Sequence, residues 1–86
     1  MAKTDKLIHK ILQDRSDASI GFDELRSLLK RLGFDERIRG GHHIFRRADV
    51  EERLNLQREG AKAKPYQVRQ VRAVILKYQL GVDDDA

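Results

Sequence analysis

Apolar residues recur at helical spacing in the first third of the chain. One stripe predicts a first helix capped by Thr4, and its members are Leu7, Ile8, Ile11 and Leu12. A second, more regular stripe predicts a helix with Asp23 as its N-cap and Gly33 just past its end. The apolar positions of this second helix are Leu25, Leu28, Leu29 and Leu32.

The last third of the chain carries a third helical stripe. Pro65 suits the first position of a helix, and Gly81 suits its end. The apolar face between them comprises Val68, Val71, Val74, Ile75 and Tyr78.

Between the second and third helices the pattern changes to that of β-strands. Residues 34–39 and 42–47 flank Gly40-Gly41, a pair that predicts a two-residue hairpin turn. Apolar and polar residues alternate again over 52–57, which predicts a third strand after a connection at 48–51. Residues 58–64 form a loop rich in Gly, Ala and Lys. The predicted fold class is therefore α+β, with helices packed on one face of a three-stranded antiparallel sheet.

Strand alternation separates the two adjacent histidines of the second strand. Phe45 is its largest apolar residue and should face the helices, so His43 should share that packed side. His42 and Ile44 should then point to the open face. Because neighbouring strand residues point to opposite faces, and no cysteine or acidic cluster is nearby, we do not expect a metal site or any cofactor.

Length and charge limit the possible functions. The 86 residues make one domain, without cysteine and without an apolar run long enough to span a membrane. We expect a single domain at 1–82, with 1–19 as a helical extension and 83–86 as an acidic disordered tail. Without the tail aspartates the chain carries 18 basic and 11 acidic residues, or +7. A basic body favours nucleic acid and then an acidic protein as partner, and the lack of cysteine favours the cytoplasm.

The stretch from Arg37 to Arg47 concentrates the candidate chemistry. Histidine titrates near neutral pH, so His42 could act as a base or an acid on an RNA phosphodiester, with His43 as a possible supporting residue. Amides at Gly40 and Gly41 could stabilise the charge that develops on phosphorus, although a Gly-Gly pair is more often only a turn. The basic residues predicted to contact RNA are Arg39, Arg46, Arg47, Lys62 and Lys64. The two lysines could equally be solvated loop residues, and Lys64 could also assist His42.

The segments Leu28-Leu29-Lys30-Arg31-Leu32-Gly33-Phe34 and Gly40-Gly41-His42-His43-Ile44-Phe45 resemble the HicA family of bacterial toxins. The stretch from Lys62 to Val71 resembles a longer HicA-like subgroup, and the similarity covers about residues 20–80. The resemblance implies a fold like that of double-stranded-RNA-binding domains, with the first helix as an addition. It also implies a metal-independent mRNA interferase that is neutralised by a HicB antitoxin, with no membrane or DNA partner for the toxin alone.

The first histidine of the pair, His42, best matches the essential histidine of this family. Gly41 stands where a serine is common, and Leu54-Asn55-Leu56-Gln57 replaces a valine-proline run often seen in the third strand. These departures leave open a weakly catalytic member. The alternatives are a non-catalytic module that binds double-stranded RNA, and a domain that binds an acidic protein.

Overall fold

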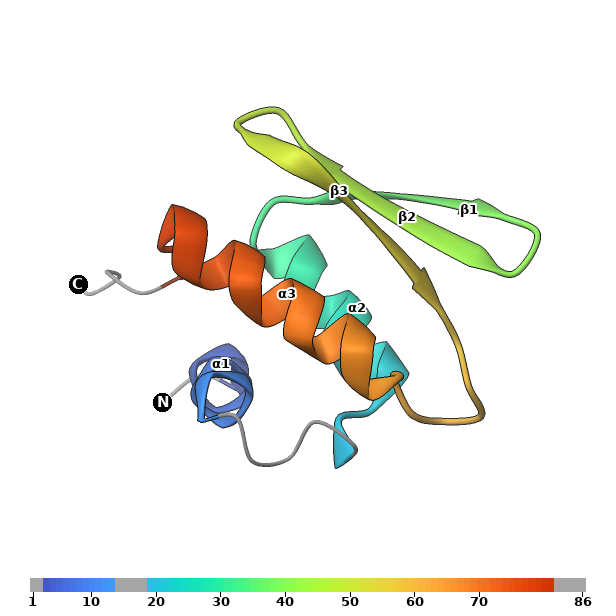
Figure 1. Cartoon of the computed structure of the whole chain (residues 1–86), viewed down its shortest axis with the longest axis horizontal. Helices are drawn as coiled ribbons and strands as arrows, with labels where there is room; N and C mark the ends of the chain where they lie inside the picture. Colours follow the sequence, from blue (N-terminus) through green and yellow to red (C-terminus); the bar gives the residue numbers. More distant parts are fainter. Residues whose placement is uncertain (1–2, 14–18, 82–86) are drawn as a thin grey trace.

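The computed structural model describes residues 3–13 and 19–81, with side chains from residue 7 onward. Its elements follow the order helix, helix, three strands, helix (Figure 1). Their bounds are α1 Lys3–Leu12, α2 Phe22–Arg31, β1 Asp35–Arg39, β2 His42–Arg47, β3 Val50–Gln57 and α3 Pro65–Tyr78. The predicted α+β class and the three-stranded antiparallel sheet are both confirmed.

The sheet has the order β1-β2-β3, so β2 lies in the middle and β1 at an edge. Arg39 pairs with His42 across the hairpin, and His42 pairs with Gln57 on β3. The register shifts between Phe45 and Arg47, because Phe45 pairs with Leu54 whereas Arg47 pairs with Val50. With this shift β3 begins at Val50, two residues before the strand predicted over 52–57.

The helices α2 and α3 cover one face of the sheet, and α1 lies on the side of these helices away from the sheet (Figure 1). One apolar cluster joins the layers, with Ile8 and Ile11 from α1 and Phe45, Leu54 and Leu56 from the sheet. Burial of each such side chain contributes about 1.5–3 kcal/mol. The extension therefore belongs to the core, and the opposite face of the sheet stays open.

Helix boundaries differ from the prediction at three places. Thr4 lies inside the first turn of α1, which already includes Lys3. The N-cap of α2 is Gly21 and not Asp23, because Oε1 of Glu24 accepts a hydrogen bond from the Gly21 amide at 3.0 Å. Helix α3 ends before Gly81, since Gln79 already adopts the left-handed conformation at φ 54°.

Other boundary predictions are confirmed. Gly33 follows α2 with φ 94°, and the Phe34 amide donates to the Leu29 carbonyl at 3.0 Å, as in a Schellman motif. Pro65 is the first residue of α3, and the predicted apolar face of this helix is buried apart from the half-buried Tyr78.

The predicted start of the third strand is wrong, because Val50 and Glu51, which were expected in the connection, are the first residues of β3. The predicted acidic tail at 83–86 lies outside the described residues.

Candidate functional site on the open face of the sheet

His42 is the first residue of β2 and is exposed directly after the hairpin turn. Its Nδ1 lies 3.2 Å from Oδ1 of Asn55 on the neighbouring strand β3. A carbonyl oxygen only accepts, so the contact is a hydrogen bond when Nδ1 carries the proton, and in the neutral ring Nε2 is then the acceptor nitrogen. Both the neutral ring and the imidazolium can keep this bond. Asn55 can therefore hold the ring in one orientation.

The hairpin turn beside His42 is sterically open. Gly40 has φ 57°, a left-handed conformation that glycine adopts without strain. A Cβ at Gly40 would meet no atom within 4 Å, and one at Gly41 would meet only Nε2 of Gln57 at 3.9 Å. The backbone here is accessible to a ligand, and position 41 has room for a serine.

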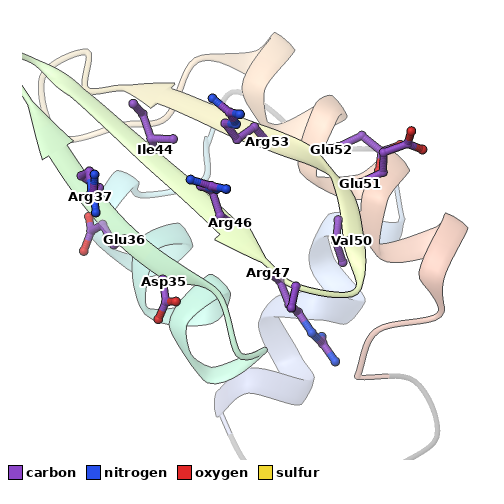
Figure 2. A pocket seen from close by; sticks show the side chains of 11 residues that line it. Asp35, Glu36, Arg37, Ile44, Arg46, Arg47, Val50, Glu51, Glu52 and Arg53 are labelled. Carbon is purple, nitrogen blue, oxygen red and sulfur yellow. The ribbon is translucent and has the colours of Figure 1, made fainter.

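Four exposed arginines share the open face with His42. Arg37 and Arg39 come from β1, Arg46 from β2 and Arg53 from β3. The pairing of the strands places all four side chains on the same face of the sheet as His42. No ion pair involves any of the four within residues 7–13 and 19–81. Three of them, Arg37, Arg46 and Arg53, surround Ile44 in the middle of the sheet (Figure 2). The open face is thus a cationic surface whose charges are available to an anion.

His43 lies on the opposite side of the sheet, as alternation predicted. Its Nδ1 contacts Oε2 of Glu36 at 2.8 Å, and its ring packs edge-on against Phe22 with centroids 5.0 Å apart. Its side chain is only 12% exposed. His43 therefore joins the sheet to α2 and has no direct route to a ligand on the open face.

Glu36 is the centre of a charged cluster below β1. Arg26 donates to both carboxylate oxygens, from Nε at 2.6 Å and from the guanidinium Nη2 at 3.0 Å, and Nζ of Lys30 lies 3.4 Å away. The Arg26 hydrogen bonds are the main cause that lowers the pKa of Glu36 to about 2, and the His43 bond adds to them. Desolvation acts in the opposite direction and is outweighed. The cluster holds β1 on α2 beneath the candidate site.

The remaining residues predicted to contact RNA lie elsewhere. Arg47 donates to the Leu32 carbonyl at 2.7 Å and pairs with Asp49 at 2.7 Å, so it supports the end of α2. Lys62 is exposed in the loop after β3, and Lys64 is the half-buried N-cap of α3. No hydrogen bond joins either lysine to His42 in the part of the chain that the structure describes. The site on the open face therefore contains His42, Arg39 and Arg46 from the predicted set, but not these three residues.

Sequence reasoning missed Asn55, Gln57, Arg37 and Arg53 as members of this face. For the two arginines of β1 the sequence did contain a signal. If the strands are paired outward from the Gly40-Gly41 turn, Arg39 lies opposite His42, and Arg37 and Arg39 fall on the same face as His42. For β3 the register depends on the shift between Phe45 and Arg47, which the sequence does not reveal.

Comparisons with known protein families, with curated proteins and with solved structures gave no match. Among the described residues no group of three or more His, Asp or Glu side chains is placed to hold a metal ion. No described helix is both long and apolar enough to cross a membrane.

Proposed function

We propose that this chain is a HicA-like endoribonuclease that cleaves mRNA without a metal ion and is neutralised by a HicB-like antitoxin. The observation that carries the proposal is the position of His42, exposed on an arginine-bearing face and held through Nδ1 by Asn55. The packing of α2 and α3 on one face of a three-stranded antiparallel sheet supports the related proposal of a double-stranded-RNA-binding-domain-like fold. A neighbouring reading frame for a HicB-like protein would add support.

In the proposed reaction Nε2 of His42 accepts the proton of a ribose 2′-hydroxyl. The 2′-oxygen forms a bond to the adjacent phosphorus, and the bond from phosphorus to the 5′-oxygen breaks. Water supplies the proton to the leaving oxygen. Arg39, the cross-strand neighbour of His42, and the amides of the Gly40-Gly41 turn stabilise the negative charge that develops at phosphorus. The products carry a 2′,3′-cyclic phosphate and a 5′-hydroxyl.

Incubation of the purified protein with a defined RNA tests this function directly. We expect cleavage at the same rate with and without an excess of chelator, and cyclic-phosphate product ends by mass spectrometry. An RNA with 2′-deoxy sugars at the cleaved positions should stay intact. Loss of cleavage with chelator would contradict the metal-independent mechanism. RNA that is bound but never cut would instead indicate a non-catalytic RNA-binding module, and no RNA binding would favour a protein-binding domain.

Asn55 is proposed as a positioning residue for His42. We expect Asn55→Ala to lower kcat about tenfold with little change in KM, because the ring loses its fixed orientation. Asn55→Asp should restore part of the rate and move the acidic limb of the pH profile to higher pH, since a carboxylate beside Nδ1 favours the imidazolium, which cannot act as the base. An Asn55→Ala protein with unchanged kcat would contradict this role. Gln70→Ala, which removes an exposed amide from α3 in the helix layer, is the control.

A further inference from the structure

A hollow of about 630 Å³ lies on the open face of the sheet, beside the end that carries the β2–β3 turn. Half-buried Ile44 contributes apolar surface to it, and Arg37, Arg46 and Arg53 stand around that residue, one from each strand (Figure 2). Arg46 is four residues beyond His42 on β2, or about 13 Å along the strand. The arginine-bearing end of the hollow is therefore separate from His42, whereas Ile44 lies only two residues from His42 on the same face.

The acidic residues around this hollow do not neutralise its arginines. Asp35 is the cross-strand partner of Arg46, but its carboxylate points away from the guanidinium (Figure 2). Glu52 is bound to Lys77 and Tyr78, with oxygens 2.8 Å from each. Glu36 is occupied by the Arg26 cluster. Glu51, the fourth acidic residue of the lining, is exposed and forms no ion pair with these arginines among the described residues. Three guanidinium groups thus remain available around an apolar surface.

We propose that this hollow is a second nucleotide subsite, which holds an unpaired nucleotide of the RNA away from the cleaved bond. Arg46 and Arg53 bind its phosphate, with Arg37 on the other side, and Ile44 contacts its base or ribose. Guanidinium groups bind phosphate oxygens in pairs, and the charge of the face complements a nucleic acid strand. This inference rests on the proposed function in one respect: if RNA is cleaved at His42, the strand runs from His42 along β2 to the hollow.

The apolar surface of Ile44 favours a single strand over a duplex. In an A-form duplex the bases are stacked and paired, so only phosphates and ribose hydroxyls would reach a flat sheet. An unpaired base can leave the stack and cover Ile44. The hollow therefore selects single-stranded RNA, with the arginines giving affinity and Ile44 giving the preference for unpaired bases.

Binding of a short fluorescent oligonucleotide with 2′-deoxy sugars tests this subsite without any cleavage. We expect the double variant Arg46→Gln/Arg53→Gln to bind more than tenfold more weakly and to lower the slope of log affinity against log salt by about 1.4. Ile44→Thr should weaken binding without changing that slope. Arg31→Gln, which removes an exposed arginine from α2 in the helix layer, should bind like wild type. Circular dichroism of each variant checks that it folds.

Three outcomes would overturn the inference. The folded double variant could bind as tightly as wild type, a duplex of equal length could bind as well as the single strand, or polyglutamate could compete as well as an oligonucleotide. The last result would indicate an acidic protein as the partner. The proposed function fails separately, if wild type does not cut RNA. If cutting is confirmed, the double variant should raise KM for a long RNA.

Discussion

Replacement of His42 by alanine is expected to lower the rate of RNA cleavage on the order of a thousandfold, the usual contribution of a positioned acid–base group. Binding of RNA should change little, because the arginines of the open face remain. The cleavage rate of a labelled RNA under single-turnover conditions measures the first effect, and fluorescence anisotropy measures the second. If the proposed function holds, expression of wild type should arrest bacterial growth and expression of the variant should not.

Two other histidines provide controls for this experiment. His9 is exposed on α1, in the layer farthest from the open face, so His9→Ala should keep the wild-type rate. His43→Ala should be less stable because Glu36 and Phe22 lose a partner, yet its folded fraction should still cut RNA. A His42→Ala protein that cuts RNA at the wild-type rate would rule out His42 as the acid–base residue. Loss of activity in folded His43→Ala alone would move that role to His43.

Replacement of Glu36 by glutamine is expected to destabilise the fold by about 3 kcal/mol, because Arg26 loses its buried acidic partner and keeps only the exposed Asp23. The Glu36 side chain is only 5% exposed, so water cannot take its place. For a domain of this size the loss corresponds to a fall in Tm of more than about 10 °C. Calorimetry or thermal circular dichroism measures it. Glu52→Gln is the matched control, since its exposed pair with Lys77 should contribute no more than about 1 kcal/mol.

The pH dependence of stability gives a second measure of the same cluster. The pKa of Glu36 falls from 4.5 to about 2 on folding, so its contribution is complete above pH 4.5 and is lost as the pH falls toward 2. That difference corresponds to about 3 kcal/mol. We therefore expect a steeper acid loss of stability in wild type than in Glu36→Gln. Parallel curves, or a variant as stable as wild type at pH 7, would contradict the role of the cluster.

The hairpin, and the placement of His42 and His43 on opposite faces of the sheet, could be predicted from the sequence because both depend on local rules. A two-residue glycine turn fixes the register of β1 on β2, and the period of two then assigns every side chain of β2 to a face. Phe45 identified the buried face correctly.

The start of β3 was missed for a physical reason. The missed residues are Val50 and Glu51, because the polar Glu52 stands at an inward position and interrupts the alternation that would lead back to Val50. Its partners Tyr78 and Lys77 are distant in the sequence. Arg47 was misread in the same way, because the Leu32 carbonyl and Asp49 bind a side chain that looked free. The cap of α2 depended on Glu24 reaching back to Gly21, where Asp23 was the residue with the stronger propensity. Polar residues with tertiary partners are thus the ones that local patterns misplace.

The position of β1 at the edge of the sheet has a consequence for solubility. An edge strand presents unpaired amides and carbonyls along which the strand of another chain can add, and charged side chains discourage such pairing. Four of the five residues of β1 are charged, in the sequence Asp-Glu-Arg-Ile-Arg. The same arginines that make the open face attractive to an anion therefore also protect the chain from aggregation. We therefore expect the double variant Arg37→Gln/Arg39→Gln to aggregate more readily than wild type.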